Sequence, residues 1–317
     1  MATHTPVMVR DRVGYFPGHV NIGLVLGNSG AILIDSGLDT QTAKKIKKGL
    51  EAIAQPLYAI LQTHAHADHF GGNAYLLSCW PKAKVYAPPL EEAVIRYPIL
   101  EPIYLSMGAE PLDVLRNKFL LAPASRVDHL LPIEGEVEID GVGMTILSLP
   151  GHSWQQVGVV CDEICFAADS YLGESVLEKH KLPFLVDVHE TMLSLVKLAQ
   201  TRYDGYLPGH GPYTTSTQEI QDVLRKNKEW HERICSVLEG ILKEERTLED
   251  ALAALCEHLE ISIENASNYV LLRTALMGYL VGLFREERVT YRIAENRWLW
   301  GKKDFPQTEV DGDGDDR

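Results

Sequence analysis

Short apolar runs alternate with amphipathic stretches along the first two thirds of the chain. Apolar runs at residues 20–26 and 31–34, separated by a Gly-Asn-Ser-Gly turn, predict two paired strands. Residues 40–53 repeat their apolar positions at helical spacing and carry an exposed lysine face, which predicts an amphipathic helix. This alternation of strands and helices indicates an α/β protein. Further elements are predicted at 57–61 (strand), 71–79 (helix) and 84–87 (strand).

Residues 88–128 interrupt this alternation, and strands return after them. The interrupting stretch is long, punctuated by prolines and mostly helical in pattern, so we interpret it as an insertion between two strand-rich halves. Beyond it, the pattern predicts two hairpins, a helix and a final short strand. These elements span residues 137–139, 145–149, 158–161, 164–167, 190–200 and 205–207.

Helical patterns dominate from residue 219 onward, and a hairpin pattern closes this part of the chain. Thr247 is expected to cap the second helix, because Asp250 follows it at capping-box spacing. Three helices followed by a hairpin is the order of a winged-helix module, so we predict a large domain at 1–218 and a smaller, mainly helical one at 219–303. The acidic residues 304–317 are predicted to be a disordered tail. The predicted elements are 219–244, 248–259, 265–286, 289–293 and 297–300.

The amino-acid composition indicates the cellular compartment of the protein and excludes some classes of binding partner. The formal net charge is -14, and such an acidic surface repels phosphate backbones, so we expect no nucleic-acid partner. Five cysteines, an odd number without a Cys-x-x-Cys pair, suit a reducing cytoplasm. Neither an apolar leader nor a run long enough to cross a membrane is found, so we expect a cytoplasmic protein without a membrane partner.

The densest group of chemically capable residues follows the predicted strand at 57–61. The sequence Thr-His-Ala-His-Ala-Asp-His places His64 and His66 two residues apart in an extended loop, where they can point the same way. Asp68 and His69 come where the chain bends into a helix, so they can reach a second point a few ångströms away. Neutral imidazoles and a carboxylate suit zinc, and also iron or manganese.

Three later residues repeat the same placement. His152, Asp169 and His210 each follow a predicted strand directly and lie on loops rich in glycine or other small residues. Loops at strand ends are where an α/β scaffold assembles a site. Any one of these residues alone is better explained as a turn or cap. Their joint occurrence with the first motif favours a site for metal ions.

The chain has the motif His-x-His-x-Asp-His, and a loop histidine, a strand-end aspartate and a last histidine follow it in this order. With this set of motifs, residues 20–212 resemble the metallo-β-lactamase superfamily. Within that superfamily the motifs are similar to those of glyoxalase II. The resemblance implies an αββα sandwich with metal ions in a cleft at one edge. Asp35 matches the family's first motif and is expected to orient the histidine loop. The implied ligands are His64, His66 and His152 for one ion, Asp68, His69 and His210 for the other, and Asp169 as the bridge.

The resemblance also implies a reaction. Two zinc ions, or iron or manganese in their place, about 3.5–4 Å apart can bind a shared water and lower its pKa, giving a metal-bound hydroxide that attacks the substrate. Asp68 is the predicted catalytic residue, which orients the nucleophile and later carries a proton. A small thioester or ester is the preferred substrate. A lactonase and an endoribonuclease or phosphodiesterase are the alternatives, and a non-catalytic binding protein is a further one.

Several expectations concern the surroundings of the site. The insertion is expected to overhang the cleft and set substrate size, and the apolar part of the last helix to pack on the large domain or on another subunit of a homodimer. Residues 219–303 hold 13 basic and 15 acidic side chains, and this lack of a basic excess argues against a nuclease. His180, His189, Tyr171 and Tyr213 are candidates for substrate contact, with ordinary packing as the alternative; the remaining histidines, His4, His19, His129, His231 and His258, are interpreted as surface or core residues.

Overall fold

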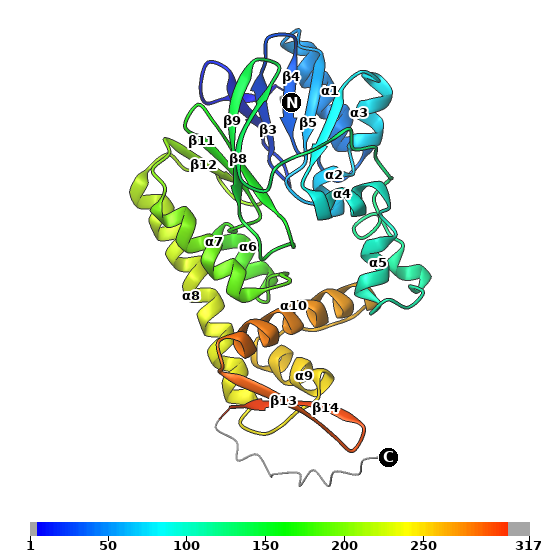
Figure 1. Ribbon diagram of the computed structural model, residues 1–317, viewed down its shortest axis with the longest axis vertical. Helices are drawn as coiled ribbons and strands as arrows, with labels where there is room; N and C mark the ends of the chain where they lie inside the picture. Colours follow the sequence, from blue (N-terminus) through cyan, green and yellow to red (C-terminus); the bar gives the residue numbers. More distant parts are fainter. Residues whose placement is uncertain (1–4, 304–317) are drawn as a thin grey trace, which may run out of the picture.

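The computed structural model describes residues 5–303, and two facing β-sheets form the half of the molecule that is uppermost in Figure 1. The first sheet has seven strands in chain order. Neighbours are antiparallel from β1 to β4 and parallel from β4 to β7, which places the ends of β4 and β5 at the same edge. The strands are β1 (Val7–Met8), β2 (Val13–Phe16), β3 (Ile22–Leu26), β4 (Ala31–Ile34), β5 (Leu57–Leu61), β6 (Lys84–Ala87) and β7 (His129–Leu130).

The second sheet has five strands in the order β12-β11-β10-β9-β8. All its neighbours are antiparallel except β11 and β12, which run parallel because helix α7 crosses between them. The predicted strands of this half are confirmed, with bounds shifted by a few residues. The strands are β8 (Gly135–Ile139), β9 (Val142–Ser148), β10 (Val157–Cys161), β11 (Ile164–Ala168) and β12 (Gly205–Pro208).

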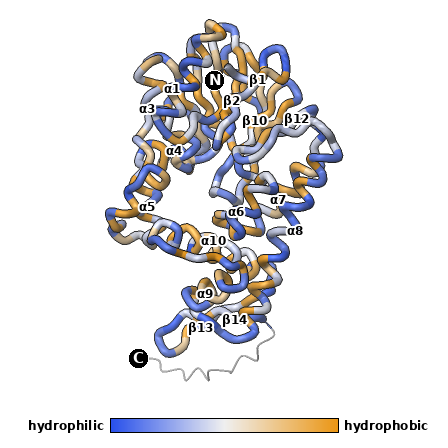
Figure 2. Tube along the Cα trace, turned by 180° about the vertical axis from the view of Figure 1, so that it is seen from behind, coloured by the Kyte–Doolittle hydropathy of each residue, from blue (hydrophilic) through white to orange (hydrophobic). Residues whose placement is uncertain are grey.

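Helices cover the outer faces of both sheets, so the strands are buried on two sides. Apolar side chains of the two inner faces, among them Ile32 and Val159, pack into one core. The outer face of the first sheet packs against α1 (Thr40–Ala52) and α3 (Asn73–Cys79). The outer face of the second packs against α7 (Val188–Gln200) and the start of α8. Strands buried in this way are almost continuously apolar (Figure 2). The predicted αββα sandwich is confirmed.

The insertion is less helical than its pattern predicts. It holds α4 (Pro89–Arg96), α5 (Leu100–Leu105) and one 3-10 turn at Asp113–Leu115, and the rest is irregular. The helical path stops after α5 because Met107 and Gly108 both have positive φ angles, 57° and 81°. Periodicity alone does not register such a break. Other short elements also escaped prediction, namely β1, β2, β7, α2 (Ala67–Phe70) and α6 (Glu174–His180).

The C-terminal part has the predicted order of three helices and a hairpin. Thr247 caps α9 as expected: its hydroxyl accepts from Asp250 N at 3.1 Å. Helix α8 runs from the sandwich into this part (Figure 1), and its first turns pack on the second sheet through Ile220 and Leu224. Its later turns pack with α9 and α10. The elements are α8 (Thr217–Ile241), α9 (Leu248–His258), α10 (Ala266–Arg285), β13 (Val289–Ala294) and β14 (Arg297–Lys302).

Helix α10 packs on the sandwich of its own chain, which was one of the two predicted placements for its apolar stretch. Gly278 and Gly282, one turn apart, bring it close to the start of α7. A Cβ at Gly278 would lie 2.7 Å from Leu185 Cδ1, and one at Gly282 would collide with Val188. Only residues without a side chain allow this approach.

Two expectations concern the ends and the exterior. The predicted disordered tail, 304–317, lies outside the described residues. Within residues 5–303, the longest apolar helices fall short of what crossing a bilayer requires.

Candidate metal centre

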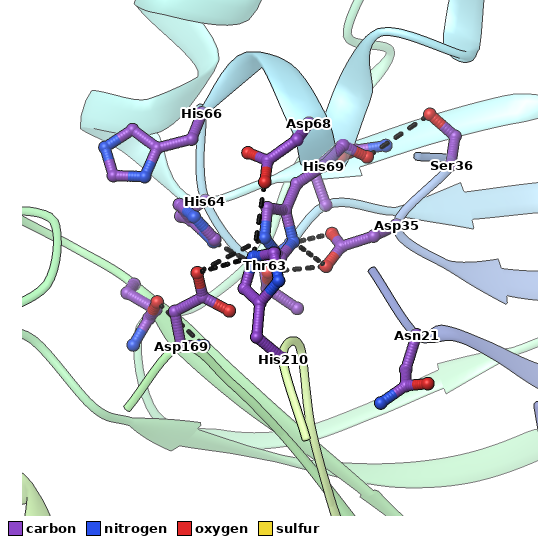
Figure 3. Close-up of polar contacts among 12 residues, drawn as sticks. Asn21, Asp35, Ser36, Thr63, His64, His66, Asp68, His69, Asp169 and His210 are labelled. Carbon is purple, nitrogen blue, oxygen red and sulfur yellow. Dashed lines mark hydrogen bonds and ion pairs between the residues drawn. The ribbon is translucent and has the colours of Figure 1, made fainter. Parts of the chain in front are cut away.

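The seven predicted ligands come together at one edge of the sandwich. Figure 3 labels six of them, all except His152. Each follows the end of a strand: the histidine loop follows β5, and the later ligands follow β9, β11 and β12. Their ligand atoms form three overlapping groups, in each of which the atoms lie within 4.8 Å of one another. The groups are His64, His66 and His152; His64, His69 and Asp169; and Asp68, His69 and His210.

The histidine loop fits closely against the end of β4. Helix α2 begins at Ala67, directly after His66, so Asp68 and His69 lie in its first turn. A Cβ at Gly71 would collide with Leu38 O, and one at Gly72 with Ser36 O. The two glycines therefore let the helix lie against the β4 loop.

Asp35 fixes the orientation of two imidazoles. Its carboxylate accepts from Thr63 N at 2.8 Å, from Thr63 Oγ1 at 2.8 Å and from His69 Nδ1 at 2.7 Å. Because the Thr63 hydroxyl donates to Asp35, it accepts from His64 Nδ1, 3.0 Å away. When these rings are neutral, their Nε2 atoms carry the lone pair, and both Nε2 atoms are buried without a hydrogen-bond partner. The expected orienting role of Asp35 is confirmed.

Backbone carbonyls orient two further imidazoles. His152 Nδ1 lies 3.0 Å from Phe184 O, and His210 Nδ1 lies 2.9 Å from His19 O. A carbonyl oxygen only accepts, so both Nδ1 atoms carry the proton and both Nε2 atoms offer a lone pair. His152 Nε2 lies 2.8 Å from His66 Nδ1, a separation of two ring nitrogens that suits joint binding of a cation.

Asp169 lies between the two outer groups. Its Oδ2 is 3.4 Å from His152 Nε2, 3.4 Å from His210 Nε2 and 3.5 Å from His69 Nε2. A side chain at Gly209 would collide with Asp169 Oδ1, so glycine is required where β12 ends. The carboxylate is thus within reach of ligands from both groups, as a bridging residue must be.

The electrostatics of the centre fit bound cations. Among the described residues, the carboxylates of Asp35, Asp68 and Asp169 pair only with histidines, never with lysine or arginine. Buried carboxylates without a cation are costly. Three lone-pair atoms, His64 Nε2, His69 Nε2 and Asp169 Oδ1, are buried and lack a hydrogen bond. Imidazole nitrogens with carboxylate oxygens form the donor set of zinc hydrolases.

The pKa values of the histidines differ between the group of His64, His66 and His152 and the group of Asp68, His69 and His210. Burial lowers the pKa of His66 to about 3 and also lowers that of His152, so these imidazoles are neutral, as a metal ligand must be. Burial also acts against protonation of His69 and His210, but nearby carboxylates, Asp169 above all, outweigh it and raise both pKa values. The second group therefore attracts positive charge more strongly.

Glu91, in α4 of the insertion, ties the two histidine-bearing loops together. Its buried carboxylate accepts from Ala65 N at 2.9 Å, from Ser153 Oγ at 2.5 Å and from Gln155 N at 2.9 Å. Burial raises its pKa against the effect of these hydrogen bonds. Glu91 could not be predicted as part of the centre, because nothing in the local sequence pattern shows that α4 reaches both loops.

Helix α10 holds the segment that orients His152. That segment, residues 184–187, is called the strap below. The strap binds the His152 loop through Phe184 O and through the amides of Val186 and Asp187, which donate to Gly151 O at 2.8 and 3.1 Å. Gly278 of α10 lies directly against the strap. The C-terminal part therefore supports a loop of the centre.

A cavity of about 720 Å³ opens on the centre. His66, Asp68, His152, Asp169 and His210 line it, and His64 and His69 lie buried behind them. The insertion borders it as expected, through Glu101, Phe119 and Leu120.

The candidates for substrate contact divide clearly. His180 lines the cavity, whereas His189 is bonded to Glu286 instead. Tyr171 and Tyr213 belong to apolar cores, so the packing interpretation holds for both. His19, interpreted from sequence as a surface or core residue, also lines the cavity, and its ring packs edge-on against His210.

Comparison with known proteins places this centre in a family. The model of the metallo-beta-lactamase superfamily matches residues 15–210, more than half of the chain. The protein belongs to this superfamily, and it is a metal-dependent hydrolase. The resemblance found in the sequence is confirmed.

Individual relatives are distant. A probable metallo-hydrolase of Streptococcus pyogenes is 26% identical over 63% of this chain and 82% of its own length. The atrochrysone carboxyl ACP thioesterase of Aspergillus fumigatus is 24% identical over 70% of this chain, which spans 61% of that enzyme. A hydroxyacylglutathione hydrolase of Synechococcus is 46% identical over 50 residues, 16% of this chain and 20% of that enzyme.

The fold as a whole, including the C-terminal part, recurs in a solved structure. A metallo-beta-lactamase family protein from Thermus thermophilus superposes with a TM-score of 0.66. It covers 94% of this chain and 97% of its own, at 18% identity.

Proposed function

We propose that the protein is a dinuclear hydrolase of thioesters or esters. In this proposal His64, His66 and His152 hold one ion, Asp68, His69 and His210 hold the other, and Asp169 reaches both. Zinc is the preferred metal, and the donor set also accepts iron or manganese. The observation that carries the proposal is the cavity of about 720 Å³, which is lined by five of the seven ligands on one side and by mostly apolar residues elsewhere.

The chain's own residues set up hydrolysis around the ions. When bound, two divalent cations supply Lewis acidity that makes water a nucleophile at neutral pH and polarises a carbonyl group. Asp68 lines the cavity; burial acts to raise its pKa, but His69 and His210 outweigh this and hold the pKa low. Its ionised carboxylate accepts the proton of the attacking water and returns it to the leaving thiolate as the C–S bond breaks. No side-chain nucleophile is required.

Two observations favour a thioester among the possible electrophiles. The thioesterase and the hydroxyacylglutathione hydrolase among the relatives are named for thioester substrates. Much of the cavity lining is apolar, and this part suits a polynucleotide poorly, because a nucleic-acid backbone calls for a basic, solvated groove along its whole length. We therefore propose a small-molecule substrate and no nucleic-acid partner.

Turnover of a thioester panel by the zinc-loaded protein tests the proposal. The panel contains an acyl-glutathione and acyl-coenzyme A thioesters, assayed beside His66→Ala. We expect hydrolysis that falls by about 10³-fold or more in the variant, since loss of a metal removes several kcal/mol of transition-state stabilisation. Absence of thioester hydrolysis by protein holding two ions per chain would contradict it. Lactones and phosphodiesters would then become the substrates to test.

Three organisational features remain part of this proposal. We place the protein in the cytoplasm, which is supported by five cysteines that are all free thiols. We divide it into domains at 1–218 and 219–303, which is supported by a separate apolar core in the C-terminal part. We also propose a homodimer, which sedimentation at micromolar concentration would test.

A further inference from the structure

The cavity has two chemically different sides beyond the metal centre. On one side, the ring of Phe184 lies 5.2 Å from the ring of His66 and 5.8 Å from that of His152. Phe184 packs against a buried apolar cluster that contains Leu120 of the insertion, and Leu271 of α10 packs against the same cluster. The apolar wall therefore begins directly at two of the proposed ligands.

Three segments far apart in sequence complete this apolar side. Leu120 comes from the insertion, Leu182 precedes the strap, and Ile261, Leu271 and Leu272 come from the C-terminal part. All of them line the cavity. The sandwich alone would leave this wall open, so the C-terminal part completes the binding site in addition to supporting His152.

The other side of the centre is polar and basic. His19 packs on His210 at 5.6 Å between ring centroids, and His180 with its neighbour Lys179 lies on α6 nearby. All of these residues line the cavity and, apart from His210, are exposed at its mouth. Lys45 of α1 is a further exposed, cavity-lining base.

We infer that the apolar side binds the acyl group of the substrate, and that this group is an unbranched or lightly branched hydrocarbon chain rather than a small hydroxyacyl group. The inference rests on the proposed thioester hydrolysis. The carrier leaves by the basic mouth, because burying its charged groups against Leu120 and Leu271 would remove them from water without a partner. A volume of about 720 Å³ lies within the range that accepts a whole drug-sized molecule, roughly 300–1,000 Å³.

A chain-length series tests the inference. Acetyl, butyryl, hexanoyl and octanoyl thioesters of coenzyme A are assayed with the zinc-loaded enzyme beside lactoyl-glutathione. We expect kcat/KM to rise about fourfold for each methylene that enters the apolar side, the factor that burial of one methylene supplies. A non-hydrolysable octanoyl thioether should bind with a negative heat-capacity change, whereas the acetyl analogue should show little.

A pair of variants places the effect in the C-terminal wall. Leu272→Trp fills the apolar side and should lower kcat/KM for the octanoyl thioester roughly tenfold or more, while the acetyl thioester changes little. Leu271→Ala is the second variant; it creates space and should favour longer chains. Leu193→Trp, at an exposed position of α7 that does not line the cavity, is the matched control and should leave the series unchanged.

The possible results distinguish a failure of the acyl-chain inference from a failure of the proposed thioester hydrolysis. A kcat/KM that is independent of chain length, or highest for the lactoyl group, overturns the inference and leaves the thioesterase intact. An unchanged series in Leu272→Trp overturns the assignment of the wall. If no thioester is hydrolysed at all, the proposed function fails and the inference fails with it.

Discussion

The two ends of the cavity are built by different means. At the metal end, each of His64, His69, His152 and His210 has its Nδ1 bonded to a fixed partner, so ring orientation is set by hydrogen bonds. At the apolar end, the insertion, the strap and α10 meet through side-chain packing. Hydrogen bonds to Nδ1 fix the orientation of an imidazole ring, whereas apolar packing tolerates exchange of one hydrocarbon side chain for another of similar volume. The chemistry is thus fixed at one end and the substrate range at the other.

Removal of the bridging carboxylate should have the largest effect. Asp169→Ala leaves His69, His152 and His210 facing one another without the anion between them. We expect activity to fall by about 10³-fold or more, with loss of bound metal. Metal analysis after dialysis measures the loss. Retention of two ions and full activity would remove Asp169 from the centre.

A buried imidazole in α8, bonded to α10 in the C-terminal part, should make stability depend on pH. Burial lowers the pKa of His231, whose Nδ1 lies 2.7 Å from the hydroxyl oxygen of Tyr279 of α10, to about 4. The unfolded chain, with a pKa near 6.5, binds this proton first, so stability falls as pH drops from 6.5 toward 4, by up to about 3 kcal/mol. Denaturant unfolding of the wild type and His231→Gln at several pH values checks this. Equal pH slopes in the two proteins would contradict it.

Loss of the support beneath the histidines should have an intermediate effect. Asp35→Asn keeps the shape but removes the anion that accepts from His69 and Thr63. We expect metal affinity or activity to fall about 10–100-fold. Asp140→Asn is the matched control, since Asp140 accepts from the turn at the far end of β4. If both variants lose the same amount, the effect is one of folding rather than of ligand orientation.

The smallest effect is expected at the seam between α10 and α7. In Gly282→Ala the new Cβ meets Val188 and lies 3.0 Å from His189 N. Overpacking costs about 1–3 kcal/mol, which exceeds the roughly 1 kcal/mol that alanine gains in a helix. Gly240→Ala in α8, where a Cβ meets nothing within 4 Å, should instead stabilise slightly. Thermal unfolding of both variants tests the contrast.

The difference between the metal end and the apolar end of the cavity also explains which residues could be predicted from the sequence. The ligands were predictable because each follows a buried apolar strand, and the ends of these strands meet at one edge of the sandwich. Asp35 was predictable for the same reason. Glu91, Glu101 and His19 were not, because their roles depend on contacts between segments that no local pattern connects. The irregular second half of the insertion escaped because its apolar residues face partners elsewhere in the chain.

Anomalous diffraction at the zinc absorption edge, from crystals grown with zinc, would show directly whether the centre is dinuclear. We expect two peaks in each chain, one among His64, His66 and His152 and one among Asp68, His69 and His210, with Asp169 in contact with both. A single peak, or peaks away from these residues, would contradict a dinuclear centre at the edge of the sandwich.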